Sequence, residues 1–151
     1  MMNNDKNLIN KNYTYIGLDY GTKKVGVAIG QIITLDARPL KILYKNKESL
    51  KKQLSSIVNE WSPNVIVLGY PFAKKKSKFM DEIDDFYEYL KLEYGDQIEI
   101  VKFSEVLSTE ESYMISKQLK NDKILKNNKK NVDDIAATLI LLSWFRENMV
   151  K

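Results

Sequence analysis

Acidic side chains stand at three points of the sequence where a carboxylate is unusual. Asp19 lies within YTYIGLDYGTKKVGVAIGQ (13–31), which otherwise has the composition of a β-sheet interior. Glu105 follows an apolar run in FSEVLST, and Asp133 and Asp134 begin the largely apolar segment NVDDIAATLILLSWF. Carboxylates gathered at one place repel each other and raise each other's pKa, so a fold tolerates such a cluster when a divalent cation neutralises it.

A cluster of this kind favours one type of hydrolysis. Oxygen-only ligands select Mg²⁺ or Mn²⁺ rather than Zn²⁺. Two such ions about 4 Å apart can activate a water molecule and stabilise the leaving oxygen in phosphodiester cleavage. The 151 residues include no cysteine and no histidine, which excludes thiolate nucleophiles, zinc–cysteine sites and histidine acid–base chemistry. Any chemistry must therefore use carboxylates, lysines, hydroxyls or a metal held by oxygen.

Each acidic residue also has a purely structural explanation when it is taken alone. An aspartate at a strand end, such as Asp19, commonly hydrogen-bonds the turn that follows. Asp133 at the start of a helix is favoured by the helix macrodipole whether or not it binds a metal. The spacing of Gly21 and Gly26 imitates a phosphate-binding P-loop, but that motif requires lysine and then serine or threonine after its second glycine. The metal hypothesis therefore depends on the carboxylates taken together.

The apolar pattern predicts the elements that must position these residues. Strands are expected over residues 13–20, 24–30, 37–44, 65–69 and 97–103. Helices are expected over residues 47–61, 79–94 and 133–149, with a further helix opened by the S-x-x-E capping box of Ser108 and Glu111. The first two strands are joined by GTKK, which predicts a hairpin in which Gly21 adopts a backbone angle that other residues resist.

The order of these elements predicts an α/β fold. A hairpin followed by strands that alternate with helices implies a mixed sheet with helices on its faces, because parallel neighbours need helical crossovers. Small residues at 26, 28 and 30 of the second strand leave room for something to approach the sheet closely near Asp19. We expect one domain over residues 13–151, preceded by a flexible N-terminal tail over 1–12.

The charge and the apolar pattern of the sequence limit the classes of partner and the cellular locations to be considered. The formal net charge of +4 suits an anionic partner such as nucleic acid. Only Arg38 and Arg146 among the basic residues are arginine, and this lysine bias is what an A·T-rich genome produces, so charge alone does not decide the matter. No apolar run approaches the length of a membrane span, and the first residues lack the apolar core of a signal peptide. We therefore expect a cytoplasmic protein with no membrane association.

Four motifs occur in an order and spacing that resemble a known family. YIGLDYGTKKVGVAIG, VIVLGYP, SEVLSTEES and NVDDIAATLIL together resemble the YqgF (RuvX) family of ribonuclease H-like nucleases, over residues 14–145. The resemblance implies a five-stranded mixed sheet of the ribonuclease H-like fold, antiparallel across its first three strands and parallel for the fourth and fifth. It also implies a nuclease that matures the 5′ end of pre-16S rRNA.

The resemblance also assigns roles by position. Asp19, Glu105 and Asp133 correspond to the catalytic, metal-binding acids of the family, with Mg²⁺ or Mn²⁺ as the implied cofactor. Thr22 and Lys23 match the hairpin of the family, where they could contact phosphate.

Two departures from the family pattern bear on activity. The family usually has Asp-Glu-Arg where this chain has Ser104, Glu105 and Val106, so an acid and a potential phosphate-binding arginine are missing. The loop after the fourth strand instead carries a run of lysines that could supply phosphate contacts as point charges, without the bidentate fork of arginine: Lys74, Lys75 and Lys76.

Three functions remain open at this point. The first is a metal-dependent nuclease acting on structured RNA such as pre-16S rRNA. The second is a Holliday-junction-resolving nuclease acting on branched DNA, because phosphate contacts carry little information on sugar or sequence. The third, favoured by the loss at Val106, is a nucleic-acid-binding ribosome assembly factor with weakened catalysis. The sequence does not specify whether the protein is a monomer or a homodimer.

Overall fold

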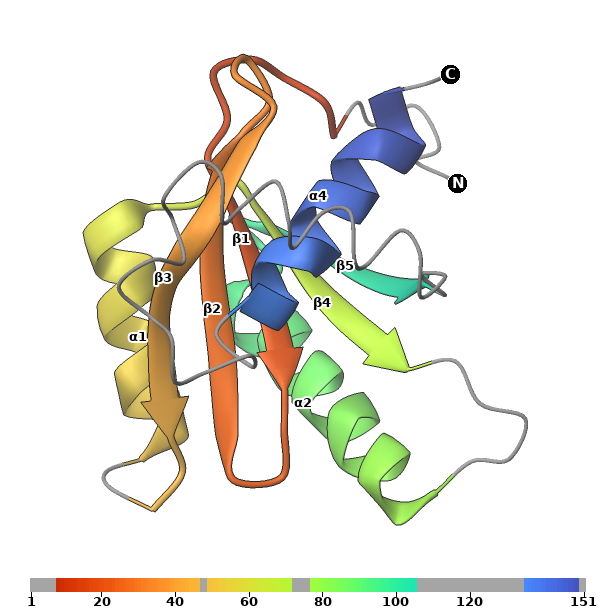
Figure 1. Ribbon diagram of the computed structural model, residues 1–151. Helices are drawn as coiled ribbons and strands as arrows, with labels where there is room; N and C mark the ends of the chain where they lie inside the picture. Colours follow the sequence, from red (N-terminus) through yellow and green to blue (C-terminus); the bar gives the residue numbers. More distant parts are fainter. Residues whose placement is uncertain (1–7, 47–48, 72–76, 106–134, 150–151) are drawn as a thin grey trace.

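The computed structural model describes residues 8–46, 49–71, 77–105 and 135–149, which form a five-stranded sheet with helices on both faces (Figure 1). The strands are β1 (Tyr15–Tyr20), β2 (Lys24–Gln31), β3 (Asp36–Tyr44), β4 (Val65–Pro71) and β5 (Glu99–Glu105). The helices are α1 (Leu50–Trp61), α2 (Lys78–Tyr94) and α4 (Ala136–Met149). The helix predicted to open at Ser108 lies outside the described residues.

The sheet is mixed, as the sequence predicted. Its strand order is β3-β2-β1-β4-β5. The pairs β1–β2 and β2–β3 are antiparallel, whereas β1–β4 and β4–β5 are parallel. The crossovers that parallel pairing requires are α1, between β3 and β4, and α2, between β4 and β5. As a result β1, β4 and β5 all end at the same edge of the sheet.

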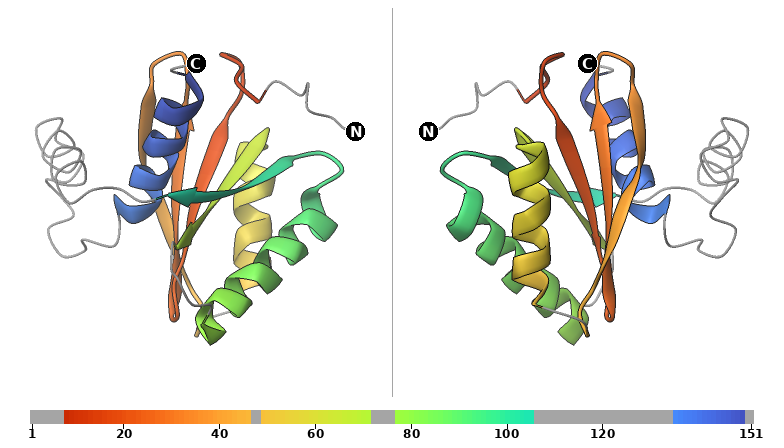
Figure 2. Two further views of the ribbon diagram at one scale, coloured as in Figure 1. Left: turned by 90° about the vertical axis from the view of Figure 1, so that its right-hand side faces the viewer. Right: turned by 90° about the vertical axis from the view of Figure 1, so that its left-hand side faces the viewer.

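Helices α1 and α2 cover one face of the sheet and α4 covers the other (Figure 2), and each face has its own core. Alternation along β1 directs Ile16 and Leu18 into the core shared with α1 and α2, while Tyr15 enters the core shared with α4. The α4 core is closed by aromatic side chains, because the Tyr15 ring lies 5.1 Å from Phe145 and 5.6 Å from Trp144 between centroids. Asp19 follows Tyr15 by four residues, so its position falls on the α4 face.

Glycine allows α4 to approach this face closely. A Cβ at Gly17 would lie 2.8 Å from the Ala137 carbonyl oxygen, and one at Gly30 would lie 3.1 Å from the side chain of Leu141. The small residues of the hairpin had been expected to leave room for a close approach. Over Gly17 the approaching element is α4 itself, whereas at Gly30 the nearest atom is the Asp36 carbonyl oxygen of β3.

We expect Gly17→Ala to lower the free energy of unfolding by about 1 to 3 kcal/mol, since the added methyl meets a backbone oxygen that cannot rotate away. Gly69→Ala is the matched control, because the nearest obstruction there is the end of the Ile140 side chain. Thermal or urea unfolding of both variants measures the difference. Equal losses in the two variants would show that the α4 backbone does not set the spacing.

Gly21 serves the hairpin in a different way from the one expected. None of the glycines that the structure describes has a positive φ, so the prediction of an unusual backbone angle was wrong. The Gly21 N–H instead donates to the Lys24 carbonyl oxygen at 2.8 Å, and a Cβ at Gly21 would lie 2.7 Å from that oxygen. Glycine is needed here because the two sides of the turn approach closely.

The residues before β1 are attached to the sheet from Leu8 onward. The Tyr15 hydroxyl donates to the Leu8 carbonyl oxygen at 2.6 Å and accepts the Asn10 N–H at 3.0 Å. Burial raises the pKa of Tyr15, so the hydroxyl stays protonated beyond the pH at which an exposed tyrosine ionises. Strand β1 begins at Tyr15, two residues after the predicted start at residue 13. The single domain over residues 13–151 stays a prediction, because residues 106–134 lie outside the described part of the chain.

Candidate functional site

Asp19 is located at the carboxyl end of β1, beside the turn of the hairpin. It pairs in register with Gly26 of β2, which presents no side chain toward it. In α/β sheets, sites form where strands end at the carboxyl edge, since the backbone there opens into loops. The predicted position of Asp19 at this edge is therefore confirmed.

An open pocket of about 430 Å³ surrounds Asp19 on the hairpin side. Thr22, Lys23 and Lys24 are among the residues that line it. The rest of the lining is mainly apolar or backbone, from Tyr20, Gly21, Gly26, Ile42 and Phe79. A pocket lined by one acidic residue, one hydroxyl residue and two lysines suits a ligand that is both anionic and able to bind through a metal.

A second, smaller hollow lies on the other side of Asp19, toward β4. Gly69, Tyr70 and Pro71 line it together with Ile140 of α4. A Cβ at Gly69 would lie 2.3 Å from the Ile140 side chain, so glycine lets α4 approach the end of β4. Asp19 thus lies between the hairpin turn and the start of α4.

Glu105 ends β5 at the same edge as Asp19. It pairs with Pro71 of β4 in a parallel register, and β4 separates β5 from β1. Neighbouring strands are about 4.8 Å apart, so the backbones of β1 and β5 are roughly 10 Å apart across the sheet. The side chain of Glu105 lies outside the described part of the structure.

The start of α4 lies over the same face of the sheet as Asp19, near the carboxyl end of β1 (Figure 1). Ile135 is buried, and the Ala137 carbonyl lies over Gly17, two residues before Asp19. Asp133 precedes Ile135 by two residues but is outside the described chain. The described residues contain no group of three or more acidic, histidine or cysteine side chains that could hold a metal. The convergence of the three predicted acids therefore stays a prediction.

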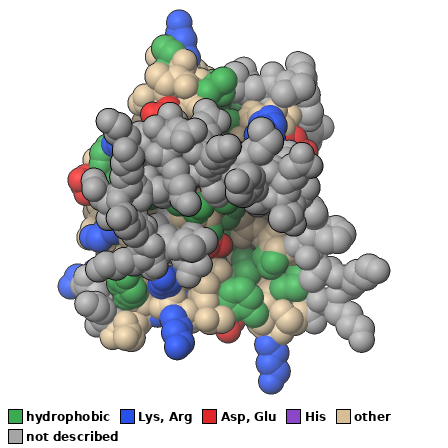
Figure 3. Space-filling view, in the orientation of Figure 1, with side chains coloured by type: hydrophobic (Ala, Val, Ile, Leu, Met, Phe, Trp, Pro, Cys, Tyr) green, Lys and Arg blue, Asp and Glu red, His purple; other side chains and the backbone are tan. Residues whose placement is uncertain are grey.

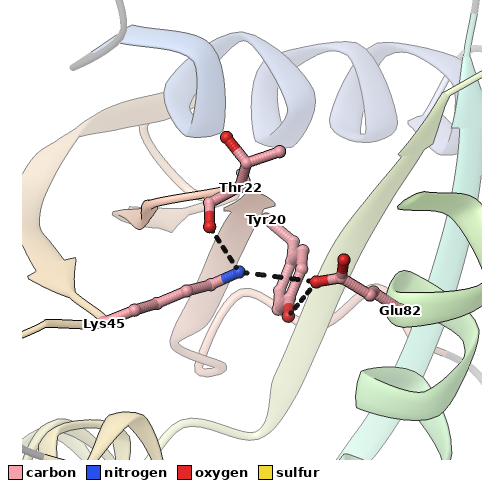
Figure 4. A network of polar contacts seen from close by, with 4 residues as sticks. All are labelled: Tyr20, Thr22, Lys45 and Glu82. Atoms are coloured by element: carbon pink, nitrogen blue, oxygen red, sulfur yellow. Dashed lines mark hydrogen bonds and ion pairs between the residues drawn. The ribbon is translucent and has the colours of Figure 1, made fainter. Parts of the chain in front are cut away.

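The structure also shows a polar network that the sequence did not predict (Figure 4). Lys45 Nζ donates to the Thr22 carbonyl oxygen at 3.2 Å and lies 3.9 Å from Glu82 Oε1. The Tyr20 hydroxyl donates to the same Glu82 oxygen at 3.3 Å. Lys45 and Glu82 are far apart in sequence and belong to none of the four motifs, so only the fold reveals their contact with the hairpin.

Lysine or arginine side chains project from the lower edge of the molecule in Figure 3, and the elements around the site differ in charge. Helix α2 has the sequence KFMDEIDDFYEYLKLEY, in which acidic residues outnumber lysines. One of these acids, Asp84, pairs with Lys102 at 3.0 Å. The hairpin turn carries Lys23 and Lys24 next to Asp19. An anionic ligand is therefore favoured on the hairpin side of Asp19 and disfavoured along α2.

The predicted lysine run of the β4–α2 loop, Lys74, Lys75 and Lys76, lies outside the described residues. Among the helices that the structure describes, none is long and apolar enough to cross a membrane.

Solved structures with a similar fold include two junction resolvases. Thermus thermophilus RuvC in complex with a Holliday junction substrate matches with a TM-score of 0.61 at 13% identity, covering 92% of this chain and 97% of that chain. The fowlpox virus resolvase in its Holliday junction complex matches with a TM-score of 0.58 at 15% identity, covering 90% and 99%. The sheet order and these matches define the ribonuclease H-like class of fold.

Sequence comparison identifies the family within this class. The family model described as "RuvX: Holliday junction resolvase" matches residues 13–147. A Buchnera aphidicola (subsp. Baizongia pistaciae) protein named "Putative pre-16S rRNA nuclease" is 39% identical over 133 residues, covering 86% of this chain and 94% of the relative. A Proteus mirabilis protein of the same name is 34% identical over 138 residues, covering 89% and 96%. The chain belongs to the RuvX family, as its motifs predicted.

Proposed function

We propose that this chain is a metal-dependent nuclease that hydrolyses phosphodiester bonds of pre-16S rRNA. The observation that supports the proposal most directly is the pocket at the carboxyl edge of the sheet, where Asp19 lies beside Thr22, Lys23 and Lys24. Membership of the RuvX family and the names of its relatives support the reaction and the substrate.

The residue types proposed for this site suit Mg²⁺ or Mn²⁺. Asp19 is a carboxylate at the edge, Glu105 ends a parallel strand there, and Asp133 precedes the helix that approaches it. A set of three carboxylates offers oxygen ligands only, which suits these hard cations. When bound, the metal would neutralise the acids and lower the pKa of a water molecule.

The hairpin supplies the remaining functions of the proposed site. Lys23 and Lys24 carry positive charge beside the pocket and would attract the phosphate backbone. Thr22 offers a hydroxyl that can donate to a phosphate oxygen. These groups would bind and orient the backbone, while Asp19 and its partner acids would hold the metal.

A cleavage assay tests this function. The purified chain is incubated with Mg²⁺ or Mn²⁺ and with matched RNA and DNA substrates, an RNA that carries the 5′ region of pre-16S rRNA and a four-way DNA junction. We expect metal-dependent cleavage of the RNA. Cleavage of the junction alone would favour the second candidate, a DNA resolvase, which the description of the family supports. Metal binding without cleavage of either would favour a binding factor.

The lysine run after β4 allows a separate test of substrate binding. If Lys74, Lys75 and Lys76 contact phosphates, replacing all three by alanine should weaken binding and make the dependence of log K on log salt shallower by roughly 2 to 3 units. Binding titrations at several salt concentrations measure this slope. An unchanged slope would mean that the lysines form a solvated surface and do not contact the substrate.

A further inference from the structure

Lys45, the residue after β3, holds the turn of the β1–β2 hairpin. Its Nζ donates to the Thr22 carbonyl oxygen at 3.2 Å, and its backbone N–H donates to the Lys23 carbonyl oxygen at 3.1 Å. Both acceptors belong to the turn that carries the predicted phosphate-binding side chains. One residue therefore fixes two consecutive carbonyl groups of this turn.

The Lys45 ammonium is itself fixed by two further contacts (Figure 4). It lies 3.8 Å from the centre of the Tyr20 ring and 3.9 Å from Glu82 Oε1, and Tyr20 donates to that same oxygen. Only 22% of the Lys45 side chain is exposed, against 55% for Glu82. Holding a lysine in one conformation costs side-chain entropy, so several simultaneous contacts are needed to keep it there.

Lys45 lies behind the hairpin relative to the pocket. Thr22 and Lys23 belong to the described lining of the pocket, whereas Lys45 does not. Figure 4 shows the Thr22 carbonyl directed toward Lys45 and the Thr22 hydroxyl directed away from it. A ligand in the pocket would therefore meet the side chains of the turn, while Lys45 holds the backbone of that turn from the other side.

Lys45 also constrains the position of Asp19 indirectly, through the ring of Tyr20. Tyr20 follows Asp19 directly at the end of β1. Its ring, which lies under the Lys45 ammonium, packs 4.9 Å from Phe86 and 6.0 Å from Phe79 of α2 between centroids. The end of β1 is thus held between α2 and Lys45.

We propose that Lys45 is a positioning residue of the cleavage site, which holds the hairpin turn and the end of β1 in the geometry that a bound phosphate backbone requires. This inference rests on the proposed nuclease function. Lys45 would act through Thr22, Lys23 and Asp19 and would not touch the substrate.

Lys45→Met tests the inference, because methionine keeps an unbranched apolar side chain and removes the ammonium. Lys41→Met is the matched control, since it removes one positive charge from an exposed position of β3. We expect Lys45→Met to lower kcat by about tenfold with little change in KM, because small displacements of positioning groups act on the reacting geometry. Amide hydrogen exchange in the hairpin turn should become faster in this variant and stay unchanged in Lys41→Met. Lys45→Arg should recover part of kcat, because a guanidinium also carries donors and charge.

The slope of binding against salt separates positioning from direct contact. If Lys45 only positions the turn, the slope for Lys45→Met should equal that for Lys41→Met. If Lys45 contacts a phosphate, the slope for Lys45→Met should be shallower by about one unit. Such a shallower slope, unchanged hairpin exchange, or a wild-type kcat in Lys45→Met would each overturn the inference. A wild-type protein that cleaves neither RNA nor DNA contradicts the proposed function itself, which the wild-type measurement shows before any variant is compared.

Discussion

Asp19→Asn should abolish cleavage while leaving the fold intact. Asparagine has nearly the same shape as aspartate but carries no charge, so it is a poor ligand for a hard divalent cation. Metal-dependent stabilisation of the reacting phosphate amounts to several kcal/mol, so we expect kcat to fall by roughly a thousandfold or more. Cleavage under saturating Mg²⁺ or Mn²⁺ measures this loss.

Metal binding gives a measure that does not depend on activity. Mn²⁺ should raise the melting temperature of the wild-type protein, because a ligand that binds only the folded state stabilises it by mass action. Asp19→Asn should lose this increase, while its melting temperature without metal should not fall. Asp36→Asn, an exposed aspartate at the start of β3, is the matched control and should behave as wild type. Asp134→Asn should also matter little, since Asp133 is the acid that matches the family. An Asp19→Asn variant that cleaves at the wild-type rate would refute the assignment.

The fold could be predicted largely because its signals are local or periodic. The apolar run VIVL before Gly69 indicated a buried strand, and β4 covers Val65–Pro71. The apolar spacing after residue 47 indicated a helix, although α1 begins only at Leu50, where the Ser49 side chain accepts the Lys52 N–H as a cap. A periodic pattern identifies the buried face of an element well, but it identifies the ends poorly because capping depends on single side chains.

The site could be predicted only where a residue stood out from its surroundings. Asp19 could be identified because a carboxylate in an otherwise apolar strand is unfavourable unless it has a binding or structural role. The reason for Gly21 was predicted wrongly, because the sequence shows that glycine is present but does not show whether a backbone angle or a close approach requires it. Lys45 and Glu82 could not be found from sequence, since their roles depend on α2 and the hairpin meeting in space. Ordinary surface residue types acquire a function there only through the tertiary fold.

The largest gain of activity is expected from Val106→Arg. Val106 follows Glu105 in sequence, and Glu105 is the last residue of β5, which ends at the same edge of the sheet as β1. The family usually has arginine at this position, and a guanidinium there could hold the scissile phosphate through two parallel hydrogen bonds. Valine removes a charge-assisted contact of about 1.5 to 3 kcal/mol. If that contact acts in the transition state, restoring it should raise kcat by roughly ten- to a hundredfold.

Val106→Lys is the control that separates charge from geometry. Lysine supplies the same charge as a point and cannot form the bidentate fork, so it should recover only part of the gain. Both variants should keep the wild-type melting temperature and Mn²⁺ affinity, because neither replaces a predicted metal ligand. If Val106→Arg brings no gain over a robust wild-type rate, this chain compensates for the missing arginine elsewhere, and Lys74, Lys75 and Lys76 are the first candidates. If neither protein cleaves although both bind Mn²⁺, the loss of arginine is not what limits catalysis, and a role in nucleic-acid binding during ribosome assembly is favoured.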